Sequence, residues 1–339
     1  MKNSELKPNW PIVGNGHIFD FLGKSLKAGK VSGSYIFSGP ANLGKATAAH
    51  FFAQSLVCEA QSGKITPCGA CPACSQAAKG IHGDIYLIKR EEDKKNILVE
   101  QIREFIKNLG MSSFLNSYKI GIIKGAESLN ESGFNALLKT LEEPKNKVVI
   151  ILTTSDFEAL PKTIVSRSQL LRFRPVPANV IYDDLIANHQ ASRSQAKNFS
   201  RLSAGRPALA LKFLRDQQYY ENYGRAVKAF SGLLNADVNE RLAAIEDILG
   251  KESRGQDAAA AAAETISVWQ NLARDLMLYD LNLADLIQHE AFTGELAAAG
   301  GGFNLKSILN LLKNLKQAKR YIGANVNPKL SLEKVAVSF

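Results

Sequence analysis

A short glycine-rich loop limits what the first half of this chain can fold into. Residues 34–37 are mostly apolar, as expected of a buried strand, and the loop Gly39-Pro-Ala-Asn-Leu-Gly44-Lys45 follows shortly after them. Residues 46–57 then have the pattern of a helix. Glycines at these positions let backbone N–H groups close around phosphate oxygens, and the lysine reaches the β- and γ-phosphates. This arrangement predicts an α/β domain with a phosphate-binding loop.

Strand and helix patterns alternate over the first half of the chain. Short apolar runs predict strands at residues 34–37, 85–88, 119–123, 148–152 and 170–173. Helices are predicted at residues 12–30, 46–57 and 99–109, and between Asn130, which can cap a helix, and Pro144, which stops one. Such alternation predicts a parallel sheet in a layered domain. We therefore expect an α/β domain at residues 1–173, with a cysteine-bearing insertion at 58–80.

Strand patterns stop after Pro177, and the rest of the chain is predicted to be helical. Residues 174–214 indicate a small helical domain, and residues 215–339 indicate a larger all-helical one. The alanine run at 258–263 is predicted as helix because alanine is the strongest helix former. One apolar stripe predicts a helical partner, inside the domain or in a neighbouring subunit. Its residues are Leu305, Ile308, Leu312, Leu315 and Ile322.

The metal-binding part of the phosphate site is incomplete. A loop of this kind expects serine or threonine directly after its lysine, as a Mg²⁺ ligand. Ala46 stands there, and Thr47 comes one residue later, about 100° further round the helix. Hydrolysis also needs an aspartate at the end of a later strand, but that position is Lys124, and Glu127 lies beyond the predicted strand end. ATP hydrolysis by this chain is therefore not expected.

Several interpretations of the incomplete site stay open. The loop is either a retained fold element without nucleotide or a loop that still binds ATP. Lys124 is either a solvated lysine or a cation that contacts a phosphate in place of Mg²⁺. The candidate nucleotide-binding residues are Gly39, Gly44, Lys45 and Thr47.

Four cysteines lie close together in the sequence, with two CxxC spacings. They are Cys58, Cys68, Cys71 and Cys74. In a chain from a reducing compartment this spacing indicates a metal site rather than disulfides. Four thiolates close a tetrahedral Zn²⁺ site with no open position, so we expect structural rather than catalytic zinc. The alternative is four thiols without a metal.

The composition is that of an ordinary globular protein. The 339 residues are 45% hydrophobic and 22% charged. No apolar run approaches the roughly 18 residues that would span a bilayer, and the first eleven residues have no secretory signal. We expect a cytoplasmic protein without a membrane partner. Its net charge of +10 indicates contact with nucleic acid or another polyanion, or simply a solvated basic surface.

Several longer motifs, in this order along the chain, resemble those of bacterial clamp-loader subunits of DNA polymerase III, members of the AAA+ family. They are the strand and loop at 34–40, the cysteines at 58–74, and residues 135–144, 160–167 and 325–332. The delta-prime type of subunit is the most similar. The family usually has cysteine where this chain has Ser168. The resemblance implies an AAA+ α/β module with parallel sheet and flanking helices, a small helical lid and an all-α collar that joins subunits.

The resemblance also assigns a role to Arg167. By itself an arginine at this place is a weak signal, although guanidinium stabilises a transferring phosphoryl group. In the family it is an arginine finger, inserted in trans into the ATP site of an adjacent motor subunit. With Ala46 and Lys124, this implies a non-hydrolysing subunit of the DNA polymerase III holoenzyme. The implied partners are the tau/gamma motor subunits and the delta subunit, and through the assembly the sliding clamp and primer-template DNA.

Two other functions stay open. The first is an ATP-hydrolysing tau/gamma-like motor, against which Lys124 argues. The second is a stand-alone nucleic-acid-binding module that uses the cysteine insertion. That insertion lacks the aromatic residues expected for base stacking.

Overall fold

The computed structural model describes residues 10–60, 66–91, 94, 96–113, 118–143, 147–249, 256–290, 294, 304–324 and 326–338. Residues 61–65 of the predicted cysteine insertion, Pro144 and Asn325 lie outside the described residues. The chain divides into two compact units. The first comprises residues 1–184 and 205–209, and the second comprises residues 185–204 and 210–339.

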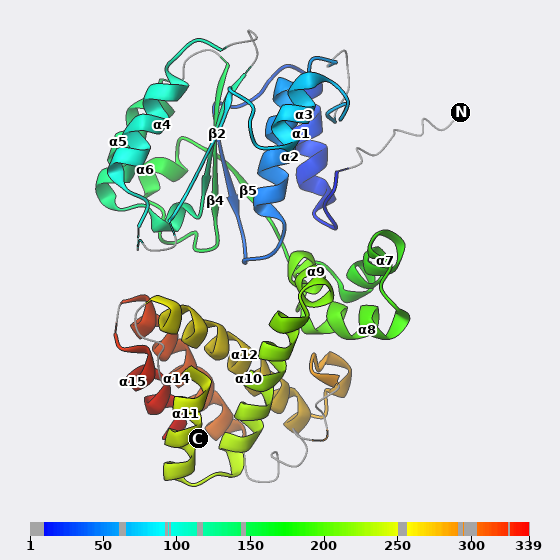
Figure 1. Cartoon of the computed structure of the whole chain (residues 1–339), viewed down its shortest axis with the longest axis vertical. Helices are drawn as coiled ribbons and strands as arrows, with labels where there is room; N and C mark the ends of the chain where they lie inside the picture. Colours follow the sequence, from blue (N-terminus) through cyan, green and yellow to red (C-terminus); the bar gives the residue numbers. More distant parts are fainter. Residues whose placement is uncertain are drawn as a thin grey trace. The chain divides into compact units, whose positions relative to one another are not determined.

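The first unit contains a sheet of five parallel strands in the order β2-β3-β4-β1-β5 (Figure 1). The strands are β1 (Ser34–Ser38), β2 (Ile85–Lys89), β3 (Lys119–Lys124), β4 (Val148–Thr154) and β5 (Gln169–Arg172). The predicted parallel sheet is confirmed, and the strand bounds differ from the prediction by one or two residues. β1 pairs with both β4 and β5, so the loop that follows β1 begins inside the sheet and not at its edge.

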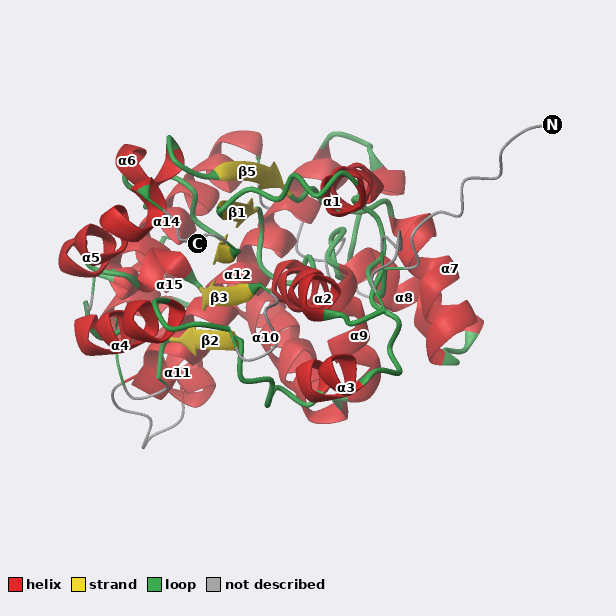
Figure 2. Cartoon of the chain, turned by 90° about the horizontal axis from the view of Figure 1, so that it is seen from above, coloured by secondary structure: helices red, strands yellow, loops and turns green. Residues whose placement is uncertain are grey.

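Helices cover both faces of this sheet, as Figure 2 shows from above. On one face lie α1 (Gly16–Lys27), α2 (Lys45–Val57) and α3 (Pro72–Ala78), and on the other α4 (Val99–Leu109), α5 (Glu131–Glu142) and α6 (Lys162–Val165). Phe37 of β1 belongs to the first core and its neighbour Ile36 to the second, because successive strand residues point to opposite faces. The continuous apolar runs of β1 and β4 follow from this double coverage.

The second unit is helical throughout its described part. It contains α8 (Arg193–Leu202), α10 (Gln217–Asn235), α11 (Val238–Leu249), α12 (Gln256–Asp280), the short 3₁₀ turn η2 (Ala284–Leu286), α14 (Leu305–Gly323) and α15 (Pro328–Ala336). Helices α7 (Ala178–His189) and α9 (Pro207–Arg215) each include residues of both units. The alanine run 258–263 lies in α12, as predicted.

The apolar stripe of α14 finds its partners inside the second unit, where the helix packs against α12 and α15. The predicted stripe was wrong in two positions. Leu305 is exposed and Leu312 only half-buried, whereas the buried residues are Ile308, Leu311, Leu315, Ala318 and Ile322. The buried residues recur at spacings of three and four, so Leu311 and Ala318 flank Ile308 and Leu315 on the buried face, while Leu305 and Leu312 lie to the other side.

A buried polar network ties η2 to the helices of the second unit. The imidazole of His289 lies 2.6 Å from Asp275 Oδ2 through Nδ1 and 2.6 Å from the hydroxyl of Tyr223 through Nε2. The same carboxylate accepts backbone hydrogen bonds from Gln288 and His289. Because each of these buried polar groups has a partner, the network fixes the segment after α12 without leaving an unsatisfied charge.

Helix α4 packs closely against Gly121 of β3. A Cβ atom at this position would lie within 2.7 Å of Phe105 Cε2 and 2.9 Å of Leu109 Cδ1. Both side chains are buried, so neither can move into solvent. The absence of a side chain at residue 121 therefore allows α4 to pack directly on β3.

We predict that Gly121→Ala destabilises the first unit by about 1–3 kcal/mol, because it overpacks a filled core. Chemical denaturation of the full chain measures the change. Gly16→Ala is the matched control, since a Cβ there meets no atom within 4 Å. Combining Gly121→Ala with Phe105→Leu should cost less than the sum of the two single changes, because the ring that clashes is gone. Additive costs would contradict the clash.

Candidate functional site

The loop between β1 and α2 has an unusual backbone. Three of its six residues have positive φ, namely Gly39 (143°), Asn42 (64°) and Gly44 (84°). A Cβ on Gly39 would strike the backbone carbonyl of Phe173, so only glycine fits there. Turns that contain residues with positive φ direct successive N–H groups to one side, which makes a concavity suited to an anion.

Among the described residues, the first backbone donors of α2 have no hydrogen-bond acceptor. Gly44 is the N-cap and provides no side-chain cap, and the first turn contains no acidic residue. Within the described part of the chain, the first helical hydrogen bond runs from the N–H of Ala48 to the carbonyl of Gly44. The N–H groups of Lys45, Ala46 and Thr47 therefore point from the helix end and have no acceptor in the part of the chain that the structure describes.

Lys45 is buried beneath this loop, with 8% of its surface exposed. Its Nζ donates to the carbonyl oxygens of Gly39, at 2.5 Å, and Pro40, at 2.6 Å. An ammonium group has three donors, so one is left over. Burial lowers the pKa of Lys45 to about 8, and the nearby carboxylate of Glu127 partly opposes that shift. An anion bound in the loop would restore the charged form.

Glu127 is a site residue that the sequence reasoning placed outside the site. The chain turns back after β3 at Gly125, whose φ is 74°, and the short helical turn η1 (Ala126–Ser128) follows. One oxygen of Glu127 accepts hydrogen bonds from the backbone N–H and the hydroxyl of Ser155, at 3.2 and 2.5 Å. The other is buried without a partner among the described residues. Gly125, directly after the strand, was the available signal for this turn.

A cavity of about 360 Å³ lies beside the loop in the first unit. Its lining residues are Pro11, Ala46, Thr47, His50, Phe51, Gln54, Leu87, Ile122 and Lys124. Ala46 and Lys124, the two positions at which the motif expects Mg²⁺ ligands, thus line the same cavity. Among the described residues that line the cavity, none has a carboxylate. Thr47, the candidate hydroxyl that comes one position late, opens onto the same cavity.

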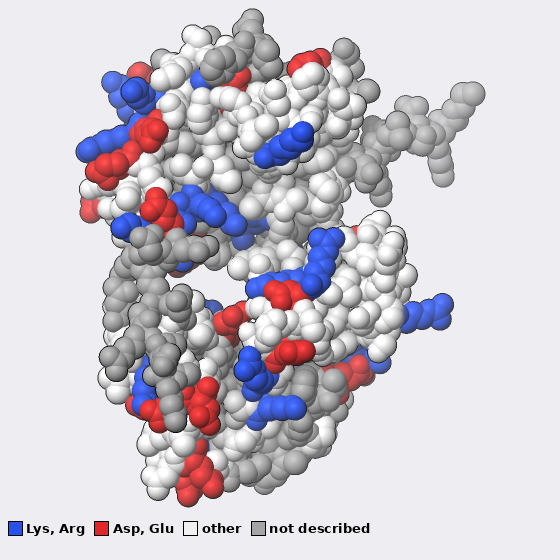
Figure 3. Space-filling view, in the orientation of Figure 1, with Lys and Arg blue, Asp and Glu red and all other residues white. Residues whose placement is uncertain are grey.

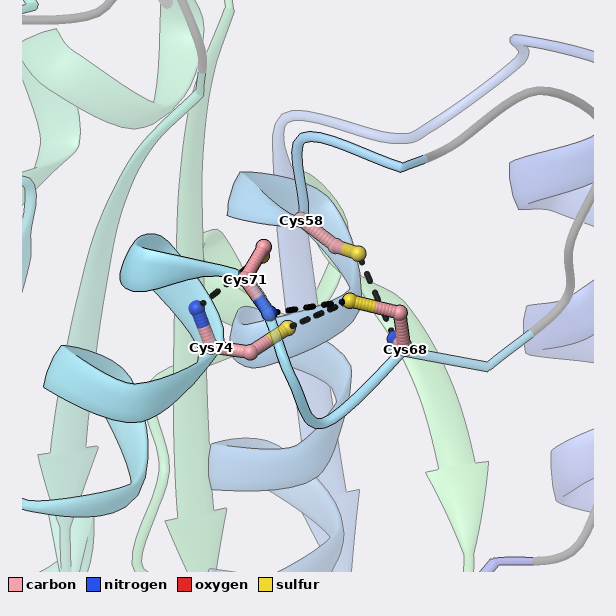
Figure 4. A group of neighbouring side chains, drawn as sticks. All are labelled: Cys58, Cys68, Cys71 and Cys74. Atoms are coloured by element: carbon pink, nitrogen blue, oxygen red, sulfur yellow. Dashed lines mark hydrogen bonds between the residues drawn. The ribbon is translucent and has the colours of Figure 1, made fainter.

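The four cysteines come together in space (Figure 4). Their Sγ atoms lie within 4.8 Å of one another, and those of Cys68 and Cys74 are 3.9 Å apart. Backbone N–H groups support three of the sulfurs: Cys68 donates to Cys58, Cys71 to Cys68, and Cys74 to Cys71, at 3.3 to 3.4 Å. The four residues could therefore hold a metal ion.

The cluster fits a tetrahedral ion. Zinc–sulfur bonds of about 2.3 Å place the sulfurs of a regular tetrahedron about 3.8 Å apart. Backbone hydrogen bonds lower the pKa of Cys68 to about 6, whereas burial raises the pKa of Cys74. A divalent ion would favour the thiolate at every position.

The cysteine cluster is attached to the helix that carries the phosphate loop. Cys58 is the C-cap directly after α2, while Cys71 caps the N-terminus of α3 and Cys74 lies within it. His50 and Gln54 of α2 hydrogen-bond to carbonyls of Ala77 and Cys74 in α3, at 2.7 and 2.9 Å. A metal here would fasten α3 to the far end of α2.

Arg167 lies just after α6, and its interactions are with residues outside the phosphate loop. Its Nη2 is 2.7 Å from the carboxylate of Glu142, at the end of α5, and its Nη1 donates to the carbonyl of Thr163 at 3.0 Å. The side chain is 36% exposed. Among the described residues, Arg167 forms no hydrogen bond or ion pair with the loop.

Comparison with known proteins finds relatives for the first unit of the chain. Residues 14–177 match the family model described as "DNA polymerase III, delta subunit". The gamma subunit of DNA polymerase III from Buchnera aphidicola (subspecies Acyrthosiphon pisum) is 33% identical over 172 residues, which are 50% of this chain and 46% of the relative. The tau subunit from Bacillus subtilis is 35% identical over 170 residues (50% and 30%). The tau subunit from Salmonella typhimurium is 31% identical over 237 residues (67% and 36%).

The chain spans less than half the length of these curated relatives. Among solved structures, a gamma subunit-related protein from Thermotoga maritima covers 94% of this chain and 97% of its own, with 18% identity and a TM-score of 0.45. Of the helices in the described part of the chain, none is both long and apolar enough to cross a membrane. By these matches, the part of the chain at residues 14–177 is similar to subunits of DNA polymerase III, among them the gamma and tau subunits.

Proposed function

We propose that the chain is a non-hydrolysing, delta-prime-like subunit of the replicative clamp loader. The observation that carries this proposal is the cavity beside the phosphate loop. Ala46 and Lys124 face it where a Mg²⁺ ion would need a hydroxyl and a carboxylate, and none of its lining residues is an acid. Without the ion, the site lacks the divalent charge that neutralises a transferring phosphoryl group.

A second candidate, the ATP-hydrolysing tau/gamma-like motor, has one observation in its favour. Glu127 is close enough to Lys45 to affect its pKa, and one of its oxygens is unpaired. However, its other oxygen is held by Ser155, and Glu127 does not line the cavity that Ala46 and Lys124 share. The missing hydroxyl and the lysine at the strand end therefore favour the non-hydrolysing role.

Arg167 is the residue that we propose acts on another subunit, as an arginine finger in the ATP site of a neighbouring motor. Its ion pair with Glu142 is a surface pair, because both side chains are a third to a half exposed. Such pairs contribute about 0–1 kcal/mol, so a phosphate of the neighbour can replace Glu142 at little cost. The planar guanidinium suits bidentate contact with phosphate oxygens.

The proposed assembly contains tau/gamma motor subunits and a delta subunit, and it loads the sliding clamp onto primer-template DNA. Residues 1–173 and 174–214 would form the AAA+ domain and its lid, and residues 215–339 the collar. The excess of positive charge suits an assembly that holds DNA. On the face shown in Figure 3, lysine and arginine lie scattered among acidic side chains, so that view offers no single DNA-binding patch.

We further propose that Cys58, Cys68, Cys71 and Cys74 hold one structural Zn²⁺. The ion would have no open position and would take no part in phosphate chemistry. Its role would be to fasten the segment after α2 to that helix, because a loop module of this size has no hydrophobic core of its own.

The isolated chain should show negligible ATPase activity, with or without primer-template DNA. Lys45→Ala is the control, because activity of a contaminating ATPase would survive that substitution. Steady turnover that depends on Mg²⁺ and disappears in Lys45→Ala would instead identify the chain as a motor.

Replacing Arg167 by alanine should lower the ATPase rate of the reconstituted loader while leaving its assembly intact. A lost arginine finger costs roughly 10³ to 10⁵ in rate at the site it serves. The total ATPase rate of the loader should fall by less, because the other ATP sites of the assembly keep their own arginine fingers. Arg167→Lys should also be slow, since lysine lacks the planar fork. Arg103→Ala, which changes an exposed arginine on α4, is the control. An unchanged rate for Arg167→Ala would remove the finger assignment.

Elemental analysis of protein purified without chelators should find about one zinc per chain. Cys71→Ser should lose most of it and melt at a lower temperature, although serine preserves the helix cap of α3. Ser75→Ala, in the same helix, should change neither value. Metal-free native protein with an unaltered melting temperature would refute the zinc site.

A further inference from the structure

Helix α14 of the second unit carries an excess of positive charge. Its 19 residues include five lysines and arginines and no aspartate or glutamate. By contrast, α10, α11 and α12 of the same unit each contain at least one acidic residue. A basic helix without acids of its own has a positive potential along its length, which attracts polyanions. The exposed face of α14 is therefore a candidate interaction surface.

The cations of α14 lie opposite its buried face. Lys306, Lys313 and Arg320 are spaced by seven residues, which is nearly two full turns, and all three are exposed. Lys316 is exposed beside them, and these four side chains together are the α14 row. The buried residues of the helix face α12 and α15 on its other side. At a rise of 1.5 Å per residue, the row is about 21 Å long.

The α14 row has no counter-charge in the described part of the chain. None of its four cations forms an ion pair with a described residue. Other lysines nearby do have partners. Lys329 of α15 lies 2.8 Å from Glu246, and Lys319, at the side of α14, donates to the hydroxyl of Ser267 at 3.1 Å. The fold thus uses these neighbouring lysines internally and leaves the row exposed.

The composition of this face favours a phosphate backbone over a protein. Asn310 and Gln317 are exposed among the cations, and amide and cationic side chains are the usual partners of phosphate oxygens. Leu309 is the exposed apolar residue between them. Protein interfaces are depleted in lysine and are anchored by aromatic residues. One leucine among cations and amides does not make such an interface.

The row also fits a duplex better than a single strand. Sites for single strands add exposed aromatic rings on which the bases stack. The aromatic residue of α14 is Tyr321, which is half-buried, accepts a hydrogen bond from Gln317 at 2.6 Å and lies 5.1 Å from Lys334 Nζ. Its ring is therefore already in use. Phosphates recur about every 3.4 Å along each strand of a duplex, so a rigid row of about 21 Å meets several of them.

We propose that the exposed face of α14 binds the phosphate backbone of duplex DNA without regard to base sequence. Lys306, Lys313 and Arg320 contact phosphates along the helix, and Lys316 adds a contact beside them. The choice of DNA among polyanions rests on the proposed function, in which the assembly holds primer-template DNA. The surface itself belongs to the second unit, whereas the phosphate loop and Arg167 belong to the first.

The test is fluorescence anisotropy of the full chain with labelled duplexes of two unrelated sequences, between about 50 and 200 mM salt. Both duplexes should bind equally, with a Kd of about 10⁻⁴ to 10⁻⁶ M at physiological salt. Lys313→Gln should lower the slope of log affinity against log salt by about 1. The triple variant Lys306→Gln/Lys313→Gln/Arg320→Gln should lower it by about 3. Glutamine keeps the helix because it is a strong helix former.

The matched control removes the same amount of charge elsewhere in the second unit. Arg193→Gln/Arg215→Gln/Lys228→Gln changes three exposed cations on α8, α9 and α10, and it should leave the salt slope unchanged. Lys313→Arg keeps the charge and should retain the native affinity. Circular dichroism and the melting temperature verify that each variant is folded.

Three results would overturn the proposal. The first is an equal salt slope for the native chain and the α14 triple variant. The second is an equal loss in both triple variants, which would reduce the effect to net charge. The third is a single strand or polyglutamate that binds as tightly as the duplex. These titrations contain no other subunit, so they can fail while Arg167→Ala still slows the reconstituted loader, and the reverse also holds.

Discussion

The position of β1 in the middle of the sheet is the constraint on which the rest of the first unit depends. Because β1 pairs with β4 on one side and β5 on the other, Ser38 lies level with Thr154 and Arg172. One strand further, Lys124 lies level with Thr153. Parallel pairing therefore brings the carboxyl ends of separate strands to one edge. The phosphate loop, Lys124 and the Glu127–Ser155 pair all lie at that edge for this reason.

At this edge of the sheet the positive charges of the site are present, but the metal-binding carboxylate is missing. Two ammonium groups remain there, one buried under the loop and one beside the cavity, while the carboxylate expected at the end of β3 is absent. The remaining acid, Glu127, is tied to Ser155. A site with positive charge and no metal ligand lacks the ion that neutralises the charge developing in phosphoryl transfer.

Helix α2 connects the two sites of the first unit. Its N-terminus forms the phosphate loop and its C-terminus ends at Cys58. The carbonyls of α3 that accept hydrogen bonds from His50 and Gln54 fasten the cysteine-bearing segment along the same helix. Anything that orders the cysteines therefore also restrains α2, although the two sites perform different chemistry.

The sequence by itself determined the local features: the strand, loop and helix around Lys45, the cysteine spacing, and the replacement of an aspartate by Lys124. These follow from neighbours a few residues apart, where propensity and spacing decide. The tertiary structure alone decided that Ala46 and Lys124 face one cavity, that Glu127 turns back toward Lys45, and that Arg167 pairs with Glu142. Contacts of that kind depend on strand order, register and the turn at Gly125, which join residues far apart in the chain and leave no periodic pattern in it.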